Sequence, residues 1–325
     1  MSAPEGAAEM VRVVRNGITE SVHTGHVVVC EAGGQVVASL GDPERLTFVR
    51  SAAKPFQALA VLEVLDGART ALDSDSLAIA CASHEGNGEQ QIQAARLLAE
   101  AGLDESALQC PPALPRDLQT ACEQRWPDPL AHNCSGKHAS FLLATVTMGA
   151  DHATYLDAAH PFQRLLAERL AAACSTQLHG PGVDGCGAPA WLLPLRALAV
   201  GFARLSAGHE PRLRRIRGAM QTYPELIGAP GAYDTELMRA DGRVVAKRGA
   251  EAVFAAGTTA GSRPLGIAVK ITDGGHRADG PVAAAVLEAL GCTVPDEVRH
   301  PVVLGGGVSQ GVVEVDTAVA NLVAG

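Results

Sequence analysis

The stretch Arg50-Ser51-Ala52-Ala53-Lys54-Pro55-Phe56-Gln57 places a serine three residues before a lysine. On one turn of α- or 3₁₀-helix the two side chains leave from the same face, so they can meet. A serine hydroxyl becomes a useful nucleophile when a neighbouring base takes its proton, and a lysine can be that base if burial or a nearby cation favours the neutral amine. The same spacing also occurs by chance on solvated helices. Read with its surroundings, the tetrapeptide predicts that Ser51 is a nucleophile and Lys54 its base.

Those surroundings are apolar. Phe48-Val49 precedes the serine, and the predicted helix that follows has apolar residues on nearly every face to about Leu65. A lysine at the start of such a buried helix is not ordinary surface charge. Pro55 suits the first turn of a helix but disfavours α conformation at the residue before it. We therefore expect a tight or irregular turn over residues 51–54, directly ahead of the regular helix.

Composition limits the classes of function. The chain has 325 residues, of which 47% are hydrophobic and 19% charged, as in ordinary globular proteins. Its net charge of -9, without a cluster of Lys and Arg, argues against a nucleic-acid or anionic-membrane surface and favours a small-molecule substrate. We find no secretory signal and no apolar run long enough to span a bilayer, so we expect a cytoplasmic protein. Its eight cysteines are then expected to be thiols or metal ligands.

The order of the elements predicts an α/β (α+β) fold with an antiparallel sheet lobe and a helical lobe. Residues 1–325 form one catalytic domain, with a sheet lobe from about 1–50 and 240–325, a helical lobe from about 55–235, and the site between them. Within these lobes we expect helices at 139–148, 160–174, 190–205 and 282–290 and a glycine-rich loop at 180–187. We also expect a strand at 266–271 and a β-hairpin in which a Gly33-Gly34 turn joins 27–29 to 36–37.

Two further residues are candidates for the same chemistry. Lys270 lies near the end of a predicted strand, close to Gly274, and could reach a cleft, although edge strands also carry lysines that discourage aggregation. Its segment, Lys270-Ile271-Thr272-Asp273-Gly274, is a loose match to the K-T-G strand that faces S-x-x-K in serine β-lactamases and penicillin-binding proteins. Ser83 ends a buried segment and is either a second hydroxyl of the site or the cap of the next helix.

A group of possible metal ligands lies in two loops. Cys134 is followed by Lys137 and His138, and Cys186 lies in the glycine-rich loop beside Asp184. Thiolate and imidazole are the ligands that zinc prefers. Because no C-x-x-C pair is present, two unrelated buried thiols remain an alternative.

Taken together, these residues resemble the thermolabile, rhizobial-type L-asparaginase family (asparaginase II). The matching stretches span nearly the whole chain in order, which makes the set far more specific than any one member. They are Val13-Val14-Arg15-Asn16-Gly17 with Glu20-Ser21, Gly25-His26, the stretch 50–57, Cys81-Ala82-Ser83-His84, Asn133-Cys134-Ser135-Gly136-Lys137-His138, Val183-Asp184-Gly185-Cys186-Gly187, Asp234-Thr235-Glu236-Leu237-Met238-Arg239, Lys247-Arg248-Gly249-Ala250-Glu251 and Leu265-Gly266-Ile267-Ala268-Val269-Lys270.

The resemblance implies a serine β-lactamase-like fold, a homodimer, and hydrolysis of L-asparagine to L-aspartate and ammonia. It implies two Ser/Lys pairs, a zinc ion beside the site, and substrate contacts. Carried over by motif, Ser51 is the nucleophile with Lys54 as base, Ser83 and Lys270 form the second pair, Cys134, Lys137 and Cys186 hold Zn²⁺, and Arg50, Asn133, His138 and Asp184 contact the substrate.

Three alternatives stay open. A β-lactamase or peptidase could use the same serine and lysines. A metallohydrolase would use zinc-bound water as its nucleophile. The third alternative is a non-catalytic amino-acid-binding protein.

Overall fold

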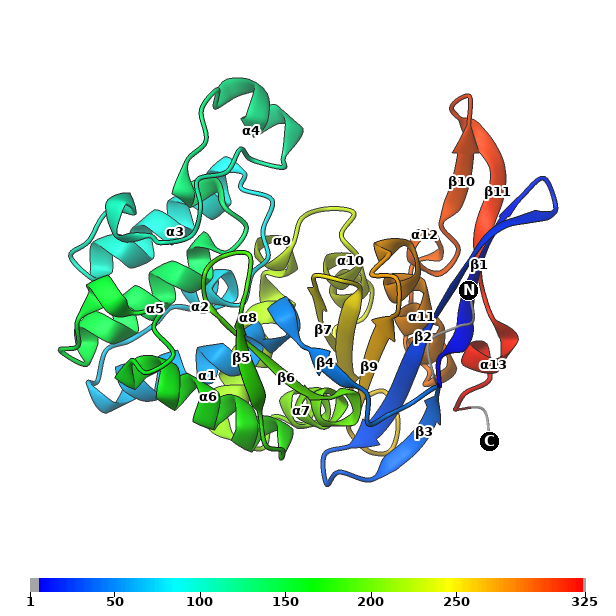
Figure 1. The fold of residues 1–325 in the computed structure, drawn as a ribbon, viewed down its shortest axis with the longest axis horizontal. Helices are drawn as coiled ribbons and strands as arrows, with labels where there is room; N and C mark the ends of the chain where they lie inside the picture. Colours follow the sequence, from blue (N-terminus) through cyan, green and yellow to red (C-terminus); the bar gives the residue numbers. More distant parts are fainter. Residues whose placement is uncertain (1–5, 324–325) are drawn as a thin grey trace.

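Eight antiparallel strands form the larger sheet of the computed structural model, which describes residues 6–323. Their order is β10-β11-β1-β2-β9-β8-β7, and β3 pairs with β2 beside this path. The N-terminal strand therefore pairs with the last strand of the chain, as Figure 1 shows by its blue and red ribbons. The strands are β1 (Ala8–Arg15), β2 (Ile18–Glu31), β3 (Val36–Leu40), β7 (Val244–Gly249), β8 (Val253–Thr258), β9 (Leu265–Ile271), β10 (Val302–Gly305) and β11 (Val308–Val315).

Helices pack against the middle of this sheet. Helix α7 (Leu195–Ala207) contacts β2, β8 and β9, and α11 (His276–Ala289) contacts β8, β9 and β11. Gly257 and Gly266 lie directly opposite each other in β8 and β9. A Cβ at either position would collide with the backbone of α7. The paired glycines therefore let α7 lie directly on the sheet, and the central strands are buried almost throughout.

The second lobe is helical and is built around α1 (Lys54–Gly67), which packs against α5, α6 and α8. Ten of its fourteen residues are buried, and the ring of Phe56 meets that of Phe202 edge-on at 5.4 Å. The other helices of this lobe are α2 (Ser74–Ala80), α3 (Gly88–Glu100), α4 (Leu118–Glu123), α5 (Ser135–Thr147), α6 (Pro161–Cys174), α8 (Pro211–Thr222), α9 (Pro224–Ile227) and α10 (Tyr233–Ala240), with 3₁₀ turns η1 (Arg50–Ala53), η2 (Glu105–Ala107), η3 (Pro129–Ala131) and η4 (His152–Thr154). Two short helices, α12 (Asp296–Arg299) and α13 (Thr317–Ala320), flank the last hairpin.

A small three-stranded sheet, absent from the sequence-based prediction, joins the lobes. Its order is β4-β6-β5, with β4 (Leu46–Phe48), β5 (His179–Val183) and β6 (Pro189–Pro194). Part of the predicted loop at 180–187 is thus a strand, and the predicted helix at 190–205 begins only at Leu195. The physical reason is Pro194, which occupies the N-cap position of α7. The residue before a proline is biased towards extended backbone, so the helix cannot begin earlier.

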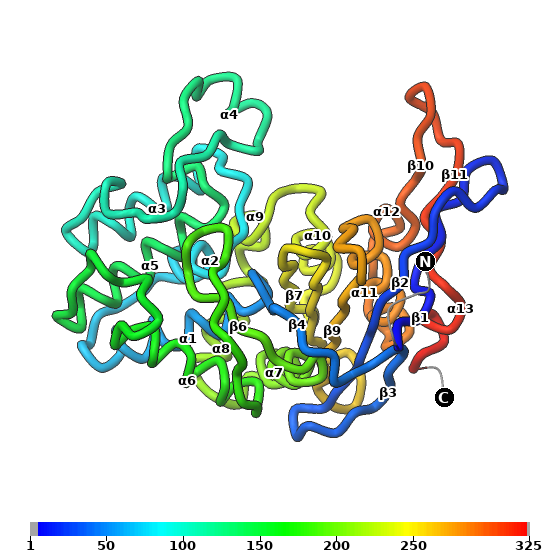
Figure 2. The backbone as a smooth tube through the Cα atoms, in the orientation of Figure 1, coloured from blue at the N-terminus to red at the C-terminus, as the bar shows by residue number. Residues whose placement is uncertain are grey.

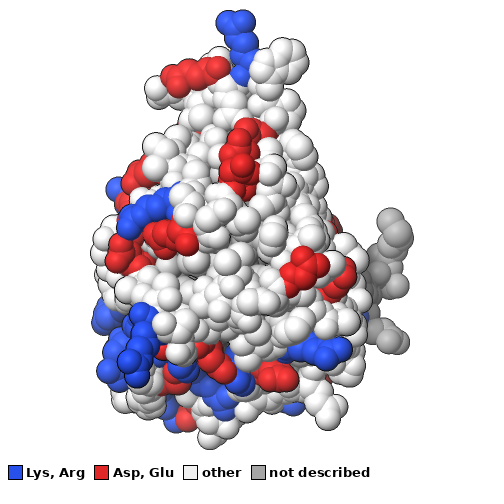
Figure 3. Space-filling view, turned by 90° about the vertical axis from the view of Figure 1, so that its left-hand side faces the viewer, with Lys and Arg blue, Asp and Glu red and all other residues white. Residues whose placement is uncertain are grey.

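The predicted fold class is confirmed: an antiparallel sheet lobe lies beside a helical lobe. Figure 2 shows that the extension carrying α4 and the β10–β11 hairpin project to the same side of the molecule, from opposite lobes. On the face of the helical lobe in Figure 3, acidic and basic side chains are interspersed among uncharged ones. None of the helices in residues 6–323 has the length and apolar character needed to cross a membrane.

Candidate active site

Ser51 lies where the two lobes meet, in the 3₁₀ turn η1 that leads into α1. The predicted tight turn ahead of the helix is therefore confirmed. Arg50 has a left-handed φ of 47°, a conformation that costs energy for a residue with a Cβ and that often marks a functional site. Strand β7 supports the turn from the other side, because a Cβ at Gly249 would lie 3.0 Å from the carbonyl oxygen of Val49 and 3.3 Å from the nitrogen of Ser51.

Lys54 is buried and points towards the second predicted serine. Its Nζ donates to the hydroxyl of Ser83 at 3.1 Å and lies 3.2 Å from the Sγ of Cys134. It also donates to the carbonyl oxygen of Ala82 and, at 3.5 Å, to that of Asn133. The lysine of the S-x-x-K turn is thus held by a ring of acceptors, one of which is a hydroxyl.

Ser51 shares two hollows with these residues. One is a pocket of about 250 Å³ lined by Ser51, Ser83, Asn133, Arg116, Arg248, Gly249, Ala250 and His276. A narrow second pocket contains both Ser51 and Lys54, together with Lys137, Arg50 and Asp184. The backbone N–H of Lys54 donates to the carbonyl oxygen of Ser51, but no hydrogen bond joins their side chains within residues 6–323. In free enzymes such bonds are often long and tighten only when substrate is bound.

Lys270 lies close to the pocket but not on Ser83. Its ammonium donates to the carbonyl oxygen of Glu251, in the turn that follows the pocket-lining Ala250. Glu251 and Ala252 both have left-handed φ values, of 62° and 51°. Burial is the main cause that lowers the pKa of Lys270. Within the described residues, the hydroxyl of Ser83 has Lys54 as its lysine partner, not Lys270.

A third lysine, Lys247 of β7, has no role in the sequence-based prediction. It is fully buried, and its Nζ donates to Asp234 Oδ2 at 3.0 Å. Burial, and then the charge of nearby Lys54, lowers the pKa of Lys247 to about 8. The segment Lys247-Arg248-Gly249 lies against the turn that carries Ser51, as the K-T-G strand was expected to do. Its lysine and glycine have the same spacing as in K-T-G, and this spacing could have identified Lys247 from the sequence.

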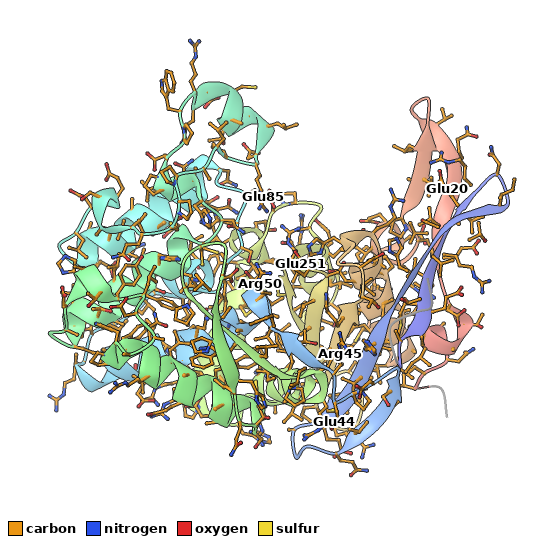
Figure 4. The ribbon with its side chains drawn as sticks, in the orientation of Figure 1. Glu20, Glu44, Arg45, Arg50, Glu85 and Glu251 are labelled. Carbon is orange, nitrogen blue, oxygen red and sulfur yellow. The ribbon has the colours of Figure 1, made fainter. Side chains whose placement is uncertain are left out.

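The pocket-lining Arg248 is held by two carboxylates. Its Nη2 donates to Glu85 Oε1 at 2.7 Å, and its Nε lies 3.7 Å from Asp234 Oδ1. Figure 4 shows Glu85 between the extension that carries α4 and the labelled Arg50. The acidic residue after Ser83-His84 thus positions an arginine of the pocket.

The predicted metal ligands come together next to Lys54. Lys137 Nζ lies 3.0 Å from Cys186 Sγ. The pKa of Cys134 lies well below its usual value because Cys186 donates a hydrogen bond to it and because the ammonium groups of Lys54 and Lys137 are close. No group of three His, Cys, Asp or Glu side chains within residues 6–323 is arranged to hold a metal. The two thiols with the Lys137 amine fit a zinc site only if the metal replaces the proton on that lysine.

The predicted substrate contacts divide into three groups. Asn133 lines the larger pocket. Arg50 and Asp184 line the narrow one and form an ion pair of 2.7 Å. Burial raises the pKa of Asp184, but hydrogen bonding to Arg50 and the charge of Lys137 outweigh it, so the pKa is low. His138 is fully buried, lines neither hollow, and pairs its Nδ1 with the Tyr155 hydroxyl at 2.6 Å, while its Nε2 has no partner among the described residues.

The family model described as L-asparaginase II matches residues 11–314. The chain belongs to this family. An amidohydrolase-type function is therefore supported for the chain, and a small-molecule substrate is indicated. No curated protein matches the chain.

Distant likenesses exist among solved structures. A candidate β-lactamase from Bacteroides dorei DSM 17855 is 14% identical, with 76% of this L-asparaginase II family chain and 85% of the other chain covered and a TM-score of 0.42. The native form of Mglu is 13% identical, with 83% of this chain and 64% of the Mglu chain covered and a TM-score of 0.38. The tris and glutamate form of Mglu is 14% identical, with 82% of this chain and 58% of the Mglu chain covered and a TM-score of 0.37.

Proposed function

We propose that the protein hydrolyses the side-chain amide of L-asparagine to L-aspartate and ammonia, with Ser51 as the nucleophile. One observation carries the proposal. Ser51 and Ser83 line the same pocket, and the buried ammonium of Lys54, three residues from Ser51, is bonded to the Ser83 hydroxyl. A pocket with two hydroxyls, one of them bonded to a buried lysine, supports acyl transfer through a serine.

The proposed reaction has two steps. Ser51 Oγ attacks the amide carbonyl carbon while neutral Lys54 accepts its proton, directly or through Ser83, and the tetrahedral intermediate expels ammonia after proton transfer to the leaving nitrogen. Water then attacks the acyl-enzyme, which releases L-aspartate and restores the Ser51 hydroxyl. Ser51 is the second residue of a 3₁₀ turn, where N–H groups lack partners within the helix, so its own N–H is suited to bind the developing oxyanion.

The other lysines have supporting roles in this proposal. Lys247 lies on β7, the strand that supports the turn carrying Ser51, and its ammonium is held there by Asp234. Lys270 holds the turn after Ala250 through the Glu251 carbonyl, and stays a candidate for proton transfer from that position.

Zinc belongs to the proposal as a neighbour of the nucleophile. Cys134, Lys137 and Cys186 would hold it, and when bound it would supply a positive charge that positions an amino-acid substrate. Support comes from the donor chemistry, since the thiol of Cys134 has a lowered pKa and lies against Lys54. The narrow pocket joins Lys137 to Ser51, Arg50 and Asp184, which are the residues such a substrate would meet.

The test is ammonia release from L-asparagine at mildly alkaline pH by the wild type and by Ser51→Ala. We expect the variant to lose roughly 1,000-fold or more in kcat, because a missing nucleophile is rarely replaced. A chelator-treated sample, with its zinc content measured before and after, forms the third arm. Loss of activity in the variant together with partial retention in the metal-free protein is the expected pattern.

The other outcomes separate the alternatives. Near wild-type turnover by Ser51→Ala, with abolition by the chelator, would move the chemistry to the metal. Hydrolysis of a chromogenic β-lactam in place of asparagine would indicate a β-lactamase. Binding of asparagine without ammonia release would indicate a non-catalytic protein.

A further inference from the structure

Three arginines surround Ser51, and two of them are already paired with carboxylates. Arg50 is bound by Asp184, and Arg248 by Glu85 and Asp234. The third, Arg116, lines the same pocket as Ser51. It has no carboxylate partner and no side-chain hydrogen bond among residues 6–323. His276, the other basic residue of the pocket, is bonded to Asp279 at 2.9 Å.

The backbone around Arg116 is fixed in place. The N–H groups of Arg116 and Asp117 both donate to the carbonyl oxygen of Glu85, at 2.7 and 3.1 Å. Pro115, just before them, is buried. Glu85 therefore has two roles: its carboxylate holds Arg248, and its backbone carbonyl group anchors the segment that carries Arg116.

The charge of Arg116 reaches into the site. After burial and the charge of Lys54, it is among the causes that lower the pKa of His84 to about 3. His84 is therefore neutral near pH 7 and adds no positive charge beside the pocket. Of the arginines that line this pocket, Arg116 is the one without a carboxylate partner in the part of the chain that the structure describes.

We propose that Arg116 binds the α-carboxylate of the substrate and so determines that the enzyme acts on free amino acids. This inference rests on the proposed function, since it assumes that the scissile amide lies at Ser51. A guanidinium group offers parallel N–H donors that match a carboxylate, and it stays charged at any working pH. Arg50 and Arg248 are already paired with carboxylates of the protein. The substrate's carboxylate would therefore supply the counter-charge that Arg116 lacks.

The inference predicts selectivity against a blocked carboxyl group. L-asparaginamide carries the same side-chain amide but a neutral α-carboxamide, which cannot pair with a guanidinium as an anion does. Arg116→Gln should lower kcat/KM for L-asparagine by roughly 10- to 100-fold, as expected for loss of a charged hydrogen bond. The same variant should change the conversion of L-asparaginamide to L-isoasparagine by less than about 2-fold, because that substrate does not use the charge. Arg116→Lys should restore part of the loss.

A matched control is available on the same segment. Arg125 is also exposed but lines neither hollow beside Ser51, so Arg125→Gln should leave both substrates unaffected. A binding measurement independent of turnover complements the kinetics. Calorimetric titration of Ser51→Ala with L-aspartate should show weaker binding, by a similar factor, once Arg116→Gln is added.

The outcomes distinguish this inference from the proposed function. If the wild type hydrolyses L-asparagine but Arg116→Gln leaves kcat/KM and L-aspartate binding unchanged, the inference is wrong and the proposed function stands. Equal losses for both substrates would also overturn it, since they would show a general structural role. A wild type that neither releases ammonia from L-asparagine nor binds L-aspartate would overturn both.

Discussion

Lys247 is a buried cation that the fold must neutralise. Its ammonium meets Asp234 at 3.0 Å, and neither side chain is exposed to solvent. Pairs of this kind stabilise a protein only when the attraction outweighs the cost of removing both charges from water. For Lys247 burial is the larger effect, because its pKa falls to about 8 despite the nearby carboxylate.

This pKa predicts how stability depends on pH. In the unfolded chain Lys247 titrates near 10.5, so between about pH 8 and 10.5 the unfolded state binds more protons and stability rises with pH. We expect the free energy of unfolding of the wild type to rise by roughly 1–2 kcal/mol from pH 7.5 to 9.5, relative to a Lys247→Met/Asp234→Asn double variant. Urea denaturation at several pH values measures the difference. A difference that stays constant over this range would contradict the lowered pKa.

The residues differ in how far the sequence could reveal them. Ser83, Lys54, Cys134 and Cys186 each lie in a recognisable sequence motif, although the motif-based prediction paired Ser83 with Lys270 and the structure places it against Lys54. The sequence could not reveal the position of Lys247, because the strand that lies next to η1 is determined by strand pairing across the whole sheet. Arg116 is a single arginine in a proline-containing loop and carries no local signal at all.

Strand β7 is the element that sets the position of the nucleophile. Gly249 brings its backbone against η1, where a Cβ would lie 3.0 to 3.3 Å from Val49 O, Ala52 N and Ser51 N. Backbone atoms cannot rotate away as a flexible side chain can. An added methyl group must therefore move the turn that carries Ser51 by a few tenths of an ångström.

Gly249→Ala should for this reason impair activity more than stability. We expect kcat/KM to fall by roughly 10-fold, since small displacements of a catalytic group are costly, while the melting temperature changes little. Gly242→Ala is the matched control, because a Cβ at that position, just before β7, meets no atom within 4 Å. If the two variants had equal activity, β7 would not be a support for Ser51.

At the level of elements the sequence predicted what depends on local pattern. The helices expected at 139–148 and 160–174 are α5 and α6, and the strand at 266–271 is β9, each within a few residues except at the start of α5. The β4-β6-β5 sheet was missed because its strands are only three to six residues long and one of them begins in a glycine-rich segment. Short strands of this kind are defined by their partners and not by their own periodicity.

On the scale of the whole molecule, two projecting hairpins expose apolar side chains. Ile18, the first residue of β2, is 72% exposed, and Val302, Leu304 and Val308 of the β10–β11 hairpin are 58–61% exposed. Figure 1 shows that these hairpins lie at one side of the sheet lobe. Several large apolar side chains grouped on neighbouring strands are typical of a surface that another chain covers.

We therefore propose that the protein is a homodimer through these hairpins. Light scattering should give twice the 33.4 kDa of one chain for the wild type, and the Leu304→Lys/Val308→Lys double variant should give the single-chain mass. Leu118→Lys, at an 82% exposed position on α4, should remain dimeric. A single-chain mass for the wild type would contradict the proposal.

The pairing of β1 with β11 also determines when the molecule can be completed. Val11 lies opposite Val315, so 304 positions separate residues that are neighbours in the sheet. While the chain is being translated, β1 has only β2 to pair with, because its other partner, β11, is the last strand of the sheet to emerge from the ribosome. Such a high contact order slows folding. The nascent sheet lobe therefore keeps an open edge at β1 until β11 has been synthesised, and an unpaired strand edge of this kind can pair with other chains and aggregate.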